Sequence, residues 1–201
     1  LEPVAISDAA MIVLEGDEYL SSPMDPRPKF LHYKPHITII TGIAWDHMNV
    51  FPTYPDYLRQ FRMLIESLGA DDTLIYCAED QDLVDLVAEI SPVCITIPYR
   101  THDYMLEEGT VIIKDEEGTA FPLEIFGNHN LQNLKAAQLA THIAGLSSKD
   151  FYNSIQSFTG ASKRLQTLHV EERLTSYLDF AHAPSKVRAT VNAVREKHPN
   201  A

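Results

Sequence analysis

Two asparagines and a histidine stand at the start of a predicted helix, where their side chains could bind a ligand. Asn130 and Asn133 are three residues apart, a spacing that places both amides on one helical face. An amide carries a donor and an acceptor, so it can recognise a purine edge, and backbone N–H groups at a helix start favour anions. The simpler interpretation is that Asn128 caps the helix, that the other two asparagines are solvated, and that His129 shapes the loop.

A carboxylate and a histidine follow two predicted strands, and together they could hold a metal ion or a phosphate. Glu15 comes directly after the apolar run Met11–Leu14, and His47 comes shortly after the β-branched run 36–43. If these strands are parallel, their C-terminal ends meet at one edge of the sheet, where open α/β sheets bind ligands. The pair Asp46-His47 is a weak signal by itself, because such dipeptides are common on protein surfaces.

Two loops nearer the C-terminal end carry further polar groups. The segment 158–164 contains a glycine and ends in a lysine and Arg164, so it could bind a phosphate or remain a charged surface loop. The segment 179–184 is a predicted tight loop between a strand and a helix, and it contains Asp179 and His182. The proline that ends this loop can begin the helix at its first turn.

The elements that must position these groups alternate between helix and strand. The segment 54–68 has an apolar stripe at helical spacing, which predicts an amphipathic helix. A strand over 73–78, a helix over 81–90 and a strand over 93–99 follow it. This alternation predicts an α/β fold with a mainly parallel, doubly wound sheet. Four prolines in residues 21–36 exclude a regular helix there and predict a surface loop.

The middle of the chain predicts an antiparallel element followed by helices. The apolar runs 110–114 and 120–125 are separated by a turn at Glu117-Gly118, which is typical of a hairpin. Helices are predicted over 129–144 and 150–158. The polar groups at the start of the first of these helices would then follow directly on the hairpin.

The last stretch predicts the start of a second domain. Strand-like pieces at 169–170 and 175–180 precede a helix over 185–197, which makes a β-loop-α unit without the remainder of a sheet. We therefore expect one domain over 1–165 and the opening of another over 166–201. The chain has no initial methionine and ends just after a helix that needs a packing partner, so we expect it to be a piece of a longer protein.

Composition excludes several classes of partner. The chain has 16 Lys+Arg against 28 Asp+Glu, and the resulting charge of −12 argues against nucleic acid or an anionic membrane as the main partner. No run approaches the ~18 continuous apolar residues of a membrane helix, and Leu1–Val4 does not begin a signal peptide. Cys77 and Cys94 lie in apolar, strand-like runs, so we expect a buried, reduced pair in a cytoplasmic protein.

Four separated motifs, taken in order, resemble those of the Mur ligase family, the ATP-dependent amide ligases of peptidoglycan precursors. The resemblance covers nearly the whole chain. The motifs are Glu15-x-Asp17-Glu18-Tyr19, then Asp46-His47-Met48, then Gly127-x-His129-Asn130-x-x-Asn133 with Ala136-Ala137, then Arg164 with Asp179-Phe180-x-His182-x-Pro184. The resemblance implies the ATP-binding central domain, without its N-terminal phosphate-loop part, and the truncated start of the C-terminal domain.

The resemblance also implies a reaction. A carboxylate of UDP-N-acetylmuramate attacks the γ-phosphate of ATP to form an acyl phosphate, and the amine of a peptide or amino acid then displaces phosphate. It implies that Glu15 binds Mg²⁺ and that His47 helps to hold a second Mg²⁺ or its water. Both ions would act on the phosphates of the nucleotide.

Five further residues receive roles from the resemblance. Asn130 and Asn133 would contact the adenine end of ATP. Arg164 would meet the phosphates through its fork of donors, and Asp179 would accept from the ribose hydroxyls. His182 would lie near the substrate.

Within the family, the run Lys29-Phe30-x-His32-Tyr33-x-Pro35 resembles members that attach an L-alanyl-γ-D-glutamyl-diaminopimelate tripeptide during cell-wall recycling. Members that add L-alanine are the near alternative, folylpolyglutamate-synthase-like ligases are a distant one, and a non-catalytic nucleotide-binding paralogue is a third. The phosphate loop G-x-x-G-K-[ST] and a domain for the uridine nucleotide are absent from the 201 residues. We therefore expect this chain alone to be inactive.

Overall fold

The computed structural model describes residues 8–171 and 174–199. Leu1–Val4, which bear on the question of a signal peptide, lie outside the described residues. No helix within the described ranges is long and apolar enough to cross a membrane.

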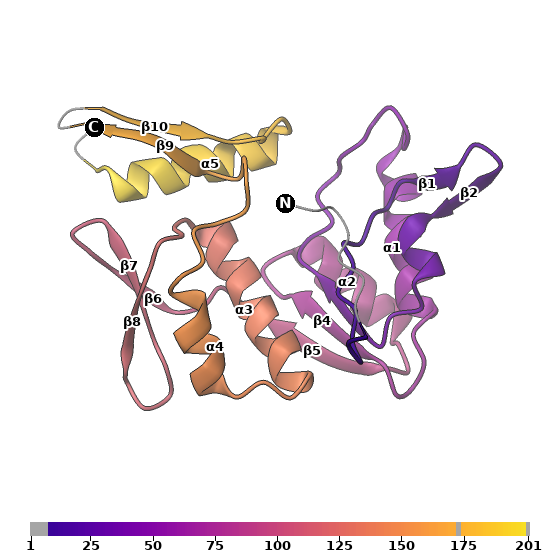
Figure 1. The fold of residues 1–201 in the computed structure, drawn as a ribbon. Helices are drawn as coiled ribbons and strands as arrows, with labels where there is room; N and C mark the ends of the chain where they lie inside the picture. Colours follow the sequence, from indigo (N-terminus) through magenta and orange to yellow (C-terminus); the bar gives the residue numbers. More distant parts are fainter. Residues whose placement is uncertain (1–7, 172–173, 200–201) are drawn as a thin grey trace.

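A parallel three-stranded sheet forms the first core, as the alternation of elements predicts. Its strand order is β3-β4-β5. Two helices connect these strands and pack beside each other, and a third helix, α3, contacts the sheet from the opposite side (Figure 1). The elements are β3 (Ile37–Ile40), α1 (Tyr54–Glu66), β4 (Thr73–Cys77), α2 (Gln81–Ile90), β5 (Ile95–Tyr99) and α3 (Asn128–Ile143).

The central strand is covered on both faces. Leu74 and Ile75 are neighbours in β4, so their side chains point to opposite faces of the sheet, and both are fully buried at 0% exposure. Burial on both faces is what a parallel sheet requires. The predicted mainly parallel, doubly wound α/β fold is confirmed.

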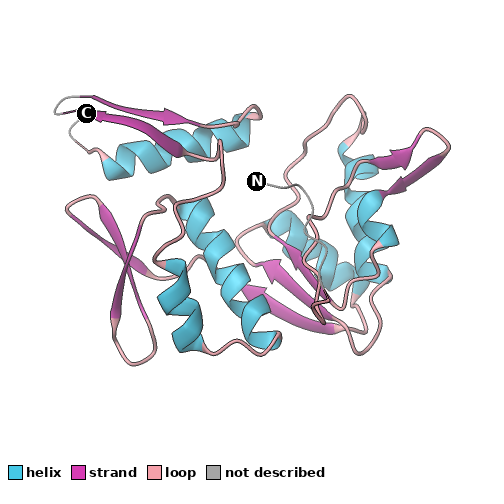
Figure 2. Ribbon diagram, viewed as in Figure 1, coloured by secondary structure: helices cyan, strands magenta, loops and turns pink. Residues whose placement is uncertain are grey.

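A second core lies between an antiparallel sheet and two helices (Figure 2). The predicted hairpin is confirmed as β7 (Thr110–Lys114) and β8 (Ala120–Leu123), and β6 (Tyr104–Glu107) adds a third strand that we did not predict. Most of β6 is exposed, and its sequence has no alternation of apolar and polar residues from which a strand could be predicted. The helix α4 (Ser148–Ile155) covers this core together with α3.

The C-terminal part contains two antiparallel strands and one helix. These are β9 (Gln166–Glu171), β10 (Leu174–Leu178) and α5 (Pro184–Lys197). Pro184 begins α5, as predicted. The start of β9 coincides with the domain boundary that we propose near residue 165. α5 nevertheless packs on the second core, because its Ala193 is buried there against α3.

The prediction of a buried strand over Met11–Leu14 is wrong. This segment is irregular, and its side chains are exposed, with Val13 at 96%. Among the described residues no strand pairs with it, so its apolar side chains have no sheet face to cover. The segment 21–36, predicted as a surface loop, contains most of a hairpin of β1 (Leu20–Ser22) and β2 (Asp25–Pro28) and the 3₁₀ helix η1 (Lys29–His32).

Truncating either buried side chain of β4 should destabilise the protein strongly. We expect Leu74→Ala and Ile75→Ala each to lower the free energy of unfolding by about 2–5 kcal/mol, because each leaves a cavity on one face. Val93→Ala is the control, since Val93 is 74% exposed, and should change it by less than about 0.5 kcal/mol. Denaturant titrations measure all three. If one β4 variant lowers the free energy of unfolding as little as the control does, the face of the sheet that carries this side chain is not covered.

Candidate functional site

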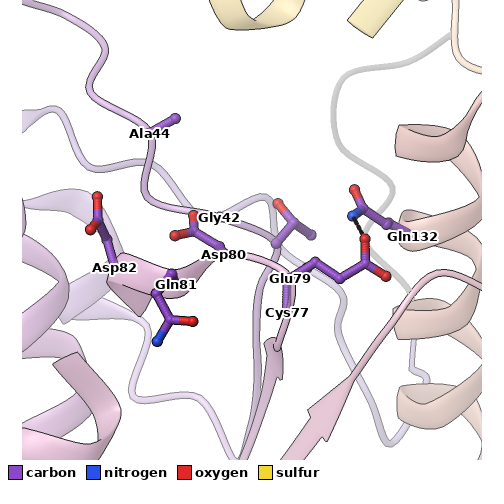
Figure 3. Close-up of a pocket in the computed structure, with 9 residues that line it drawn as sticks. Gly42, Ala44, Cys77, Glu79, Asp80, Gln81, Asp82 and Gln132 are labelled. Atoms are coloured by element: carbon purple, nitrogen blue, oxygen red, sulfur yellow. Dashed lines mark hydrogen bonds between the residues drawn. The ribbon is translucent and has the colours of Figure 1, made fainter. Parts of the chain in front are cut away.

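A cleft of about 480 Å³ lies at the C-terminal edge of the parallel sheet. The ends of β3 and β4, the start of α2 and one side of α3 form its walls (Figure 3). This is the edge at which the sequence predicts a ligand site. The lining residues are Thr41, Gly42, Ala44, Cys77, Glu79, Asp80, Gln81, Asp82 and Gln132.

Two carboxylates of this cleft are used to hold the structure together. Glu79 accepts hydrogen bonds from the backbone N–H of Thr101 at 2.7 Å and from Gln132 Nε2 at 2.9 Å, which joins the loop after β4 to α3 (Figure 3). Burial alone would raise the pKa of Glu79, but these hydrogen bonds hold it below its usual value. Asp80 caps α2 and also accepts from the backbone N–H of Ile43 at 2.7 Å.

His47 lies in the loop after β3, within a cluster of polar side chains. Its Nε2 lies 3.2 Å from Glu18 Oε1, and its Nδ1 lies 2.9 Å from the hydroxyl of Tyr19. The backbone of His47 is left-handed, with φ of 55°, and its N–H donates to Asp46 Oδ1 at 2.8 Å. Both ring nitrogens therefore have a polar neighbour already.

Asp46 connects this cluster to the C-terminal part of the chain. Its Oδ2 accepts a hydrogen bond from Lys186 Nζ of α5 at 2.5 Å. Burial alone would raise the pKa of Asp46, but the hydrogen bonds from Lys186 and from the backbone of His47 hold it below its usual value. Asp46 is thus an ionised, half-buried carboxylate shared between two parts of the molecule.

The structure does not bring Glu15 to His47. Glu15 is exposed, and no hydrogen bond or ion pair joins it to another residue in the described ranges. Within these ranges no group of three or more His, Cys, Asp or Glu side chains could hold a metal ion. The arrangement does not fit a ready-made Mg²⁺ site, because His47 would have to release Glu18 or Tyr19 to bind one. The metal roles of Glu15 and His47 stay predictions.

The start of α3 differs from the prediction in its cap. Gly127, not Asn128, is the N-cap, and no side chain caps the helix. Gly127 has φ of 87°, and a Cβ there would lie 2.6 Å from Cβ of Ala193 in α5, so glycine suits both the conformation and the close approach. Asn130 Nδ2 donates to the carbonyl of Phe126 at 2.9 Å, so part of this amide is engaged by the backbone, and Asn130 lines neither this cleft nor a smaller cavity between α3 and α5.

A smaller cavity of about 230 Å³ lies between the start of α3 and α5. Its polar walls include residues that sequence reasoning missed, because α5 follows α3 only after two strands and another helix. Asn133 is exposed and does not line this cavity. The lining residues are Asn128, His129, Gln132, Ala189, Asn192, Ala193 and Glu196.

Asp179 lies near this cavity and joins three segments. Its carboxylate accepts from the backbone N–H of Leu165 at 3.3 Å and from the hydroxyl of Thr190 in α5. Burial alone would raise the pKa of Asp179, but the hydrogen bonds from Thr190 and the backbone, aided by the nearby His129, hold it below its usual value. This carboxylate is therefore ionised.

Arg164 and His182 both contact Phe180. The Arg164 guanidinium carbon lies 5.7 Å from the centroid of the Phe180 ring, and the side chain of Arg164 is exposed. His182 Nδ1 donates to the carbonyl of Phe180 at 2.9 Å. An exposed guanidinium, an ionised carboxylate and partly free amides are donors and acceptors that suit a nucleotide.

Comparisons with known proteins find relatives over most of the chain. The family model described as "Mur ligase middle domain" matches residues 7–141. The UDP-N-acetylmuramate–L-alanyl-γ-D-glutamyl-meso-2,6-diaminoheptandioate ligase of Haemophilus influenzae is 28% identical over 96% of this chain and 44% of its own length. A UDP-N-acetylmuramate–L-alanine ligase of Desulforamulus reducens is 27% identical over 92% of this chain and 42% of its own length. The chain thus spans less than half the length of these relatives.

Solved structures share the fold. MurF from Acinetobacter baumannii superposes with a TM-score of 0.67 at 18% identity, over 80% of this chain and 37% of that one. The UDP-N-acetylmuramate:L-alanyl-γ-D-glutamyl-meso-diaminopimelate ligase from Neisseria meningitides gives a TM-score of 0.63 at 21% identity, over 74% of this chain and 48% of that one. At these low identities, the superpositions show that the proteins share a fold.

The hydrogen bonds to Asp179 predict a pH-dependent stability. Because its folded pKa is lowered, the ionised carboxylate stabilises the protein above about pH 4, and this contribution is lost as the pH falls through the folded pKa. We expect Asp179→Asn to lower the free energy of unfolding by about 1 kcal/mol at pH 7. The difference from the unsubstituted chain should shrink below about pH 4.

Denaturant titrations between pH 7 and pH 3 measure this difference, with Asp71→Asn as the control, since Asp71 is exposed. A difference for Asp179→Asn that stays constant over this range would show that the ionised carboxylate is not its source.

Proposed function

The chain belongs to the Mur ligase family, and from this premise we propose that it is part of an ATP-dependent amide ligase of cell-wall synthesis. One observation supports the proposal above others: polar residues from separated motifs converge near the C-terminal edge of the parallel sheet. Asp46, beside His47, contacts α5, and Asp179 lies near His129 at the start of α3. A site assembled from several segments suits a reaction that must align three substrates.

The proposed reaction requires positioning more than covalent help from the protein. UDP-N-acetylmuramate supplies a carboxylate that attacks the γ-phosphate of ATP, and an amine then attacks the acyl phosphate. In this proposal Arg164 holds phosphate oxygens through its exposed guanidinium. Asn130 and Asn133 contact the adenine end, and Asp179 accepts from the ribose hydroxyls.

His182 is proposed to lie near the reacting groups, where its ring could orient the acceptor. Glu15 is proposed to bind Mg²⁺ and His47 to help hold a second Mg²⁺ or its water, and these ions when bound would neutralise negative charge on the phosphates. For this, His47 would have to release Glu18 or Tyr19.

We propose the L-alanyl-γ-D-glutamyl-diaminopimelate tripeptide as the acceptor, in peptidoglycan recycling in the cytoplasm. The relative from Haemophilus influenzae supports this choice, as does the run Lys29–Pro35 in η1 and the loop after it. L-Alanine is the alternative acceptor, because a ligase named for it is 27% identical to this chain. A non-catalytic nucleotide-binding paralogue is the third candidate, since the 201 residues contain no G-x-x-G-K-[ST].

The acceptor assay separates these candidates. The complete gene product is incubated with ATP, Mg²⁺ and UDP-N-acetylmuramate, and ADP release is followed with the tripeptide or with L-alanine. We expect release that depends on the tripeptide and is at least about tenfold slower with L-alanine, a difference of about 1.4 kcal/mol in the barrier. Faster release with L-alanine would favour the alternative ligase. Nucleotide binding without any release would favour the paralogue.

Substitution of the proposed metal residues tests their roles. We expect Glu15→Ala and His47→Ala in the complete gene product each to reduce ligation at least about 100-fold, by removing a ligand of an ion that neutralises phosphate charge. Glu66→Ala, at an exposed end of α1, is the control and should retain activity. Thermal unfolding confirms that each variant is folded. Full turnover in a folded Glu15 or His47 variant would refute the metal assignment.

A further inference from the structure

α5 is fixed to the rest of the molecule by its C-terminal half. Ala193 packs closely on Gly127, the N-cap of α3, so that a Cβ at Gly127 would lie 2.6 Å from the Cβ of Ala193. The hydroxyl of Tyr104 in β6 donates to Glu196 Oε1 at 2.6 Å. Burial of Ala193 in the second core anchors this half of the helix by apolar packing, which salt does not screen.

The middle of α5 lies over the small cavity. Ala189 and Asn192 form one wall of its 230 Å³, and Asn128 and His129 of α3 form the opposite wall. A helix that spans a cavity lacks close packing along that stretch. The hydrogen bond from the Thr190 hydroxyl to Asp179 and the attachment of the N-terminal end of α5 therefore both contribute to how tightly the helix covers the cavity.

The N-terminal end of α5 is held across the molecule by an ion pair. Lys186 Nζ lies 2.5 Å from Asp46 Oδ2, although 140 residues separate them in the chain. Figure 1 shows this end of α5 pointing toward the part of the molecule that contains β3 and α1. Ala183, which precedes the helix, is buried, but Val187 in the first turn and Val191 in the middle are 43% and 41% exposed, so apolar packing along this stretch is limited.

Asp46 is well suited to this attachment. Its side chain is 13% exposed, whereas that of Lys186 is 44% exposed, so the pair is partly shielded from solvent. Asp46 Oδ1 also accepts from the backbone N–H of His47, which fixes the carboxylate in its loop. The ion pair thus restrains both α5 and the loop that carries His47.

We propose that Lys186 and Asp46 form a latch that closes α5 over the polar cavity between α5 and α3. When the ion pair breaks, the hydrogen bond from Thr190 to Asp179 and the packing around Ala193 still hold α5, but its first turns loosen and the cavity becomes more accessible to solvent. This latch is a conformational device that does not depend on the proposed ligase reaction. Because it is electrostatic and near the surface, salt weakens it.

Hydrogen–deuterium exchange of the chain tests the latch. We expect Lys186→Ala to accelerate exchange in residues 184–192 and in the loop 44–51 by about two- to fivefold, and to leave 193–198 unchanged. Arg188→Ala is the matched control, because it removes the same charge from an exposed position of the same helix. Lys186→Arg should restore slow exchange.

The salt response provides a second test that needs no variant. In the unsubstituted chain, 1 M NaCl should accelerate exchange in 184–192 relative to 193–198, and Lys186→Ala should show no further salt effect. Equal exchange in the Lys186→Ala and Arg188→Ala variants would contradict the latch. So would an absent salt effect, or an acceleration that includes 193–198, because that pattern means general destabilisation.

Discussion

Burial of β4 on both faces is the constraint on which the arrangement of the molecule depends. A parallel strand whose neighbouring side chains Leu74 and Ile75 are both fully buried needs a helical layer on each side. α1 and α2 supply one layer and α3 supplies the other, with Ala136 in the first core and Leu131 and Leu134 in the second. Because α3 is fixed from two sides, its first turn lies beside the C-terminal edge of the sheet.

Several acidic side chains at this edge form hydrogen bonds that hold neighbouring segments of the chain together. Glu79 links the end of β4 to α3 through Gln132, and Asp80 caps α2 while holding the chain after β3. Asp46 and Asp179 do the same for α5, through Lys186 and Thr190. An edge built in this way is pre-organised, since these carboxylates are hydrogen-bonded before a ligand arrives. Binding then requires only local exchanges of partner.

The elements that the sequence predicts correctly are those whose apolar residues form a clear helical or strand pattern and are buried in the fold. The helix over 81–90 matches α2, and the runs 110–114 and 120–125 became β7 and β8. Met11–Leu14 has an equally apolar pattern but stays exposed, because a strand also needs a neighbour, which pattern alone cannot supply. Asn128 failed as a cap because Gly127 must approach Ala193, a contact from α5 that local reasoning could not foresee.

The candidate site, like the fold, could be predicted from the sequence only in part. The sequence predicts His47 in the loop after a strand and Asn130 at a helix start, and these two residues lie in the loop after β3 and in the first turn of α3. Gln132 and Asn192 line cavities there but carried no signal, since a solvated amide and a ligand-facing amide look alike in sequence. The Lys186–Asp46 pair was invisible too, because surface charges find partners only in the folded chain.

Photoaffinity labelling of the complete gene product with 2-azido-ATP and Mg²⁺ would test the central claim most directly. That claim is that the start of α3 contacts the adenine end of ATP, with Asp179 at the ribose and Arg164 at the phosphates. The account predicts labelled peptides from residues 126–137 or 164–182, with labelling suppressed by excess ATP. ATP-sensitive labelling confined to other segments would contradict it.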